Sequence, residues 1–146
     1  MNVGIVTISN FPTGRQIRTE RIAKAVDADG SAAVIFARNT RSDPARGSVK
    51  TELDDREETL PYATVRRFSW LSSTRLFGLV TAPIPVNPLW ILWLWIEFSR
   101  RDMDVVVAGD LRSGLPTVIA GKLLGIPVVF DLRENYVGLA AALPAN

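Results

Sequence analysis

A chain of 146 residues has room for one hydrophobic core, and with 47% hydrophobic and 22% charged residues it has the composition of a globular protein. Because it contains no Cys and no His, it lacks disulfides, a thiolate nucleophile, a Cys- or His-based metal site and a Ser-His-Asp triad, and we expect no metal. The formal net charge of +2 is too small for the basic surface of a nucleic-acid-binding protein, so we expect no nucleic-acid partner.

The chain opens on a predicted strand followed by a predicted helix. Val3 to Ile8 is a short apolar run, typical of a strand near the centre of a sheet, and no basic region or cleavage site of a signal peptide precedes it. We therefore expect a cytoplasmic protein. Thr13 and Gln16 have the spacing of a capping box, which predicts a helix from about Thr13 to about Gly30. Four apolar side chains of this helix are expected to face inward: Ile17, Ile22, Ala23 and Val26.

The start of this helix is a candidate binding site. Its free N–H groups are expected to point to the carboxyl edge of the sheet, with Gly14, Arg15 and Arg18 beside them, an arrangement suited to phosphate contacts. The alternative is a helix that Thr13 merely caps, with solvated arginines. Gly14 alone is neither a Rossmann G-x-G-x-x-G motif nor a P-loop, so dinucleotide and ATP binding lack their motif.

Two further strands are predicted at Ala32–Ala37 and Thr64–Phe68. The segment between them, Asn39 to Pro61, is polar and long for a structureless loop, so we expect a short helix around Glu52 to Glu58 or local disorder. Its acidic residues are interpreted as a solvated surface and not as a metal site, because successive carboxylates point in several directions. These residues are Asp54, Asp55, Glu57 and Glu58.

The segment Leu76 to Ile96 has no charged residue, but three prolines interrupt it. Its continuous apolar part, Leu89 to Ile96, is too short to cross roughly 30 Å of hydrocarbon, so we predict a helix from about Asn87 and no membrane span. One interpretation has this helix dock on a membrane surface through Trp90, Trp93 and Trp95. Nearby arginines would then meet anionic headgroups, namely Arg66, Arg67, Arg75, Arg100 and Arg101. The alternative is a core helix with its tryptophans buried against the sheet or against a missing partner domain.

The last third of the chain predicts a βαβ unit. Val105–Ala108 and Pro127–Phe130 are short, non-alternating apolar runs, as expected for strands covered on both faces. Between them, a helix is expected to begin at Ser113 or in the nearby loop, with Pro116 in its first turn and Gly125 at its end. The predicted fold class is therefore α/β: a Rossmann-like open parallel sheet with helices on both faces.

Each strand of this unit is followed by an aspartate. Because such a crossover is right-handed, Asp110 and Asp131 should both emerge at the carboxyl edge of the sheet, where open α/β sheets bind ligands. An aspartate after a strand also commonly caps the next helix, and for Asp110 both interpretations stay open.

The residues after the last strand carry a family resemblance. The hexapeptide Asp131-Leu132-Arg133-Glu134-Asn135-Tyr136 is similar to a motif of the type Asp-x-His-Glu-x-Tyr, and NVGIVTISNFPTGRQIRTERIAKAV is similar to the first strand, loop and helix of the same family. The chain thus resembles the N-terminal, acceptor-side domain of GT-B fold glycosyltransferases of family 4, the group 1 type.

The resemblance implies transfer of a sugar from a nucleotide sugar to a glycan, lipid-linked or membrane-proximal acceptor. It implies catalytic roles for Asp131, Arg133 and Glu134. The implied substrate-binding residues are Gly14, Arg15, Arg18, Asp110 and Tyr136. Arg133 departs from the family, which has a histidine there, and an arginine stays protonated and cannot transfer protons as imidazole does. It can still bind a phosphate or a hydroxyl.

The resemblance also implies a two-domain enzyme. Residues 1–146 would form a single, partial Rossmann-like domain of that enzyme. We expect no cofactor in the chain, because the nucleotide sugar donor would bind a missing second domain. The alternative function is a non-catalytic membrane-docking or scaffolding subunit that recruits a separate donor-binding chain, peripheral on the inner membrane face. A third interpretation is a gene remnant that folds poorly, with exposed sheet edges.

Overall fold

The computed structural model describes residues 1–7, 11, 17–38, 57–68 and 87–131. Its elements in chain order are β1 (Asn2–Thr7), α1 (Ile17–Ala28), β2 (Ala32–Arg38), β3 (Glu57–Leu60), β4 (Ala63–Phe68), α3 (Pro88–Arg100), β5 (Val105–Ala108), α4 (Leu111–Leu124) and β6 (Val128–Phe130). The predicted strands at the start, middle and end of the chain are all present. The predicted start of the first helix, near Thr13, lies outside the described residues.

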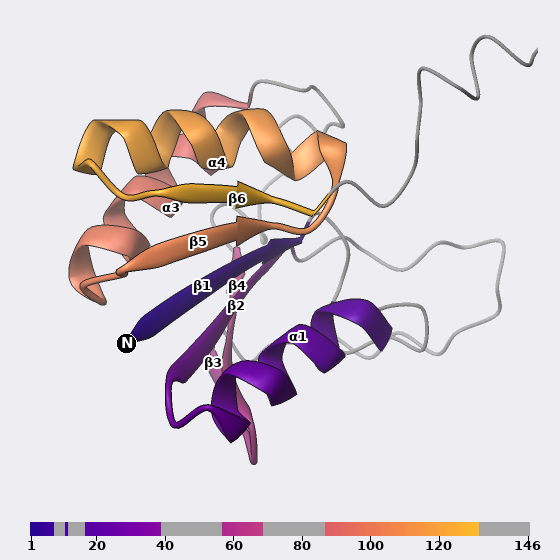
Figure 1. The fold of residues 1–146 in the computed structure, drawn as a ribbon. Coiled ribbons are helices and arrows are strands. Elements are labelled where there is room, and N and C mark those ends of the chain that lie inside the picture. Colours follow the sequence, from indigo (N-terminus) through magenta and orange to yellow (C-terminus); the bar gives the residue numbers. More distant parts are fainter. Residues whose placement is uncertain (8–10, 12–16, 39–56, 69–86, 132–146) are drawn as a thin grey trace, which may run out of the picture.

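The strands form one sheet in the order β3-β4-β2-β1-β5-β6. All neighbouring pairs are parallel except β3 and β4, which form an antiparallel hairpin. Helix α1 covers one face, and α3 and α4 cover the other (Figure 1). The predicted open sheet with helices on both faces is confirmed.

Each face of the sheet has its own apolar cluster. The cluster under α1 includes Ile5, Ile35 and Val65, and the cluster under α3 and α4 includes Val6, Phe36 and Phe68. Consecutive residues of β1 therefore enter opposite clusters, as the period of two along a strand requires. Burial on both faces explains why β1 reads as a continuous apolar run and not as an alternating one.

Helix α3 begins where the sequence predicts. The Asn87 side chain accepts hydrogen bonds from the backbone N–H groups of Leu89 and Trp90, and Pro88 occupies the first turn. None of the described helices is long and apolar enough to cross a membrane.

Two of the three tryptophans assigned to membrane docking are core residues. Trp90 and Trp93 are 4% and 3% exposed, and their stacked rings lie 5.0 Å apart, edge-on to Phe68. The docking prediction is therefore wrong for these two residues, because their indoles fill the space between α3 and the sheet. Trp95, at 39% exposure, remains on the surface.

The acidic segment before β4 differs from its prediction. Glu57 and Glu58 open strand β3, so a helix does not reach to Glu58, and residues 51–56 lie outside the described part. Glu57 stands opposite Arg66 in the antiparallel register and forms an ion pair with it at 3.0 Å. This cross-strand attraction stabilises a hairpin whose outer strand is not apolar.

Smaller corrections concern other predicted side chains. Ile17, predicted to face inward, is exposed at the first residue of α1, whereas Ala23 is buried and Ile22 and Val26 pack partly against the core. Arg66 and Arg67, assigned to headgroups, point into the two faces of the sheet and form ion pairs there.

Glu97 on α3 is the buried centre of an ionic network that reaches the surface. Its carboxylate accepts a two-pronged contact from Arg66, at 3.0 Å and 2.8 Å, and a third hydrogen bond from Arg101 at 3.3 Å. Glu57 pairs with the same two arginines. Burial alone raises the Glu97 pKa, but the hydrogen bonds and charges of Arg66 and Arg101 hold this pKa below its ordinary value of 4.5.

We predict that Glu97→Gln lowers the free energy of unfolding by about 2 kcal/mol, because it leaves two guanidinium groups without their shared carboxylate. Since the Glu97 pKa is lower in the folded than in the unfolded state, its contribution is present above pH 4.5 and is lost as the pH falls through the folded-state pKa. Urea unfolding at pH 7 and at lower pH measures both effects.

The matched control is Glu20→Gln, which removes an exposed i,i+4 pair with Lys24 and should change stability by less than about 0.5 kcal/mol. Equal losses for the two variants would contradict a stabilising role of the Glu97 network.

Candidate functional site

The candidate site lies at the carboxyl edge of the sheet, where β1, β5 and β6 end side by side. The Gly109 N–H donates to the Val6 carbonyl and the Asp131 N–H donates to the Ala108 carbonyl, both at 2.9 Å. Asp110 and Asp131 thus leave neighbouring strands at one edge, as predicted. From β1 the chain runs to β2 on one side, and later to β5 on the other, so the strand order reverses between β1 and β5. Ligands of open α/β sheets bind outside such a reversal.

Asp110 caps helix α4. Its side chain accepts a 2.7 Å hydrogen bond from the Ser113 N–H, and the Ser113 hydroxyl lies 3.3 Å from the Asp110 backbone N–H, which completes a capping box. The same hydroxyl lies 3.3 Å from the Val6 carbonyl, so α4 is fixed to the end of β1. The helix therefore begins at Leu111, in the loop before Ser113, and Pro116 lies inside it beyond the first turn. Gly125 ends it in the left-handed conformation, as predicted.

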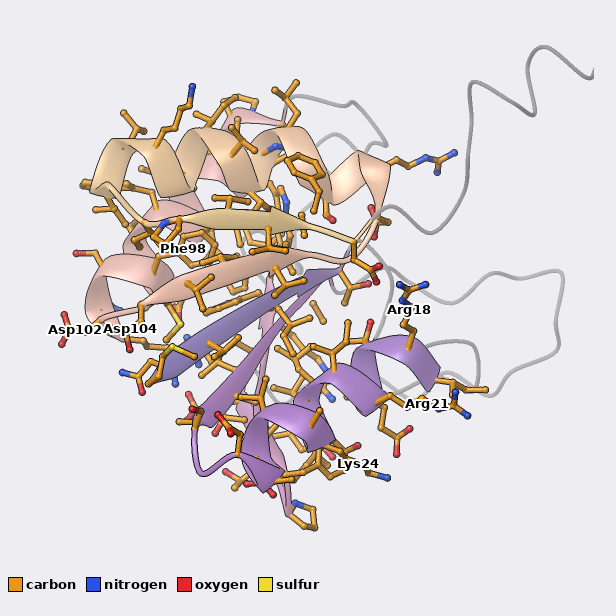
Figure 2. The ribbon with its side chains drawn as sticks, viewed as in Figure 1. Arg18, Arg21, Lys24, Phe98, Asp102 and Asp104 are labelled. Carbon is orange, nitrogen blue, oxygen red and sulfur yellow. The ribbon has the colours of Figure 1, made fainter. Side chains whose placement is uncertain are left out.

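Arg18 and Asp131 connect the two halves of this edge. The Arg18 guanidinium, in the first turn of α1, forms an ion pair with Asp131 Oδ1 at 2.5 Å. Figure 2 shows Arg18 projecting from α1 toward the strand ends. The Asp131 side chain is 10% exposed and the Arg18 side chain 56%. The pair therefore combines an almost buried carboxylate with a cation accessible from solvent.

Three of the predicted site residues, Arg18, Asp110 and Asp131, are brought to one edge. The other predicted catalytic and substrate-binding residues lie outside the described residues: Gly14, Arg15, Arg133, Glu134 and Tyr136. Trp95 lies on α3, away from the strand ends. In the described part of the chain, no group of three or more Asp or Glu side chains is placed to hold a metal ion.

The sequence interpretation missed Phe11, which is buried in the cluster under α1. The available signal was a lone aromatic residue, between Asn10 and Pro12, in an otherwise mostly polar connection. It also placed Arg67 on the surface, whereas this side chain is fully buried and donates to the Phe11 carbonyl.

Comparison with known proteins identifies the fold. The model of a glycosyl transferase 4-like domain matches residues 13–145. Sucrose-phosphate synthase from Thermosynechococcus elongatus is similar to 99% of the chain, with a TM-score of 0.70 and 14% identity, and the chain spans 36% of that protein. MurG from Acinetobacter baumannii is similar to 99% of the chain with a TM-score of 0.52 and 15% identity, and 43% of it is covered. No curated protein sequence matches. The sheet thus has the fold of the Rossmann-like N-terminal domain of GT-B glycosyltransferases.

We predict that Asp110→Ala lowers the free energy of unfolding by about 1 kcal/mol, because the Ser113 N–H at the start of α4 loses its acceptor. Asp110→Asn should stay within about 0.5 kcal/mol of the parent, since asparagine caps helices nearly as well. Thermal unfolding measures both. An asparagine variant as unstable as the alanine variant would show that Asp110 acts through something other than its cap.

Proposed function

Since this chain belongs to the glycosyl transferase 4-like family, we propose that it is the acceptor-side domain of an enzyme that moves a sugar from a nucleotide sugar to an acceptor hydroxyl. The observation that supports this best is the Arg18–Asp131 ion pair at the strand reversal between β1 and β5. It puts a carboxylate and a solvent-accessible cation together where sheets of this class bind ligands.

The two side chains suit different parts of such a reaction. The Asp131 carboxylate can accept a hydrogen bond from an acceptor hydroxyl and so orient it for attack on the sugar. The Arg18 guanidinium has five N–H donors, of which the contact with Asp131 Oδ1 engages only part. The exposed donors can bind an anionic group, such as the phosphate that departs from a nucleotide sugar.

The proposed site extends to residues near this pair in sequence. Arg133 and Glu134 follow Asp131 closely, and Gly14 and Arg15 precede α1. Arg133 would contribute a permanent positive charge and not proton transfer. Tyr136 is assigned to acceptor contact. The nucleotide of the donor would bind outside this chain, on a second domain or a separate chain.

We predict that Asp131→Asn lowers kcat/KM for sugar transfer by about 100-fold and Arg18→Met by about tenfold, because each removes a charged contact to the reacting groups. The assay is transfer by the intact native protein from a panel of nucleotide sugars. Arg21→Met, an exposed position on the same helix, is the matched control and should stay within about twofold.

Parent-level transfer by Asp131→Asn would contradict the proposed site. Absence of transfer by the intact parent protein would favour the alternative function, a non-catalytic subunit that recruits a donor-binding chain.

We also propose that an exposed strip of α3 presents the domain to a membrane surface that carries a lipid-linked acceptor. Leu92 and Trp95 are large exposed apolar residues three positions apart, and therefore on one side of the helix. Arg100 is exposed in the last turn and can attract anionic headgroups. Tryptophan favours the boundary between water and hydrocarbon, and this supports a surface association.

We predict that Trp95→Ser weakens binding to vesicles containing anionic lipid by about tenfold, because one large apolar side chain no longer enters the interface. Vesicle co-sedimentation measures the binding. Leu123→Ser, at an exposed apolar position on α4, is the control and should leave binding unchanged. A parent protein that does not bind vesicles, or equal binding by parent and Trp95→Ser, would refute the membrane proposal.

A further inference from the structure

Strand β4 carries two successive arginines that enter opposite faces of the sheet. Arg66 points to the α3 side, where it pairs with Glu97, and Arg67 points to the α1 side. The Arg67 side chain is 1% exposed and is among the largest fully buried side chains of the described residues. A buried charge is costly unless it is paired and hydrogen-bonded, so its partners matter.

Arg67 joins two segments that are distant in sequence. Its guanidinium forms an ion pair with Glu58 on β3, and its Nε and Nη2 donate to the Phe11 carbonyl at 3.2 Å and 2.9 Å. Arg67 pairs in register with Ala37, next to the end of β2, so these bonds are made near the carboxyl edge of the sheet.

Phe11 is the described residue in the connection between β1 and α1. Its side chain is 1% exposed and packs in the apolar cluster under α1, while its carbonyl is held by Arg67. Phe11 is therefore fixed at both its side chain and its backbone. Helix α1 begins six residues later, at Ile17, with Arg18 in its first turn.

We propose that Arg67 is a positioning residue: it anchors the connection between β1 and α1 at the Phe11 carbonyl, and thereby helps to hold Arg18 beside Asp131. Its importance for catalysis rests on the proposed function, whereas its control of the connection does not. Glu58 makes the β3–β4 hairpin part of this arrangement, since its carboxylate pairs with the same Arg67 nitrogen, Nη2, that donates to the Phe11 carbonyl.

Arg66 provides a matched comparison on the same strand. It is also ion-paired, but its partners Glu57 and Glu97 lie on β3 and α3 and not in the connection before α1. Loss of either arginine removes a paired charge from one strand. Only loss of Arg67 removes a bond to Phe11.

The test is backbone hydrogen exchange by mass spectrometry on the full chain. Arg67→Met should speed exchange at Phe11 and in residues 17–28 of α1 by at least about tenfold, with residues 111–124 of α4 within about twofold of the parent. Arg66→Met should leave exchange at Phe11 and in residues 17–28 within about twofold of the parent and speed exchange in residues 88–101 instead. Arg67→Lys should give an intermediate result, because an ammonium keeps the charge but loses the paired Nε and Nη2 donors to the Phe11 carbonyl.

Unchanged exchange at Phe11 and in residues 17–28 for both Arg67 variants would overturn the proposal, as would the same rise for Arg66→Met. If Arg67→Met does not fold, the result for Arg67→Lys alone tests the proposal.

A second test uses sugar transfer by the parent protein, once that activity is measured. Arg67→Lys should raise the acceptor KM severalfold and change kcat less than about threefold, as expected for displaced binding groups. Absence of transfer activity in the parent protein would count against the proposed function. It would not affect the test of Arg67 by hydrogen exchange.

Discussion

Burial of β1 on both faces is the constraint on which the rest of the described structure depends. Five of its six residues are buried; Val3 and Ile5 enter the cluster under α1, and Val6 enters the cluster under α3 and α4. Both faces need a helical cover, because a sheet this apolar cannot leave one face in water. Helix α1, between β1 and β2, covers one face, and helix α3, before β5, covers the other. The strand order must then reverse beside β1, and the carboxyl ends of β1 and β5 diverge into separate connections. The location of the candidate site is thus a consequence of how the core is covered.

The sequence was sufficient for those elements whose signal is local. Strands β1, β2, β5 and β6 are apolar runs. Asn87 is a favourable N-cap for α3, and Gly125 is a favourable residue for ending α4. Two aspartates that follow two parallel strands must lie at the same edge of the sheet. Strand β3 could not be found in this way, because Glu57 to Leu60 has no apolar pattern and is held by charges on β4.

Which side chains turn inward could not be predicted from the sequence, for a related reason. Between Leu89 and Ile96 the chain is uniformly apolar, so no polar face shows which tryptophans turn inward; Phe36 and Phe68, from distant strands, decide it. Arg67 looked like a surface residue because its compensating partners, Glu58 and the Phe11 carbonyl, are brought to it only by folding. Ionic contacts inside the sheet layers are properties of the tertiary arrangement and leave no periodicity in the sequence.

We infer that the carboxyl edge at the β1–β5 reversal, with Arg18 and Asp131, is the ligand-binding edge of the domain. The most direct measurement is a nuclear magnetic resonance titration of the isotope-labelled chain with pyrophosphate, which reports on each backbone amide and on the Arg18 side chain. If this edge binds the ligand, the resonances of the Arg18 Nε–H and of the amides of Gly109 to Ser113 shift together, while those of Gly30 and Asp102, in turns that follow helices α1 and α3, stay unchanged. Shifts confined to the turns, or spread evenly over the exposed arginines, would contradict it.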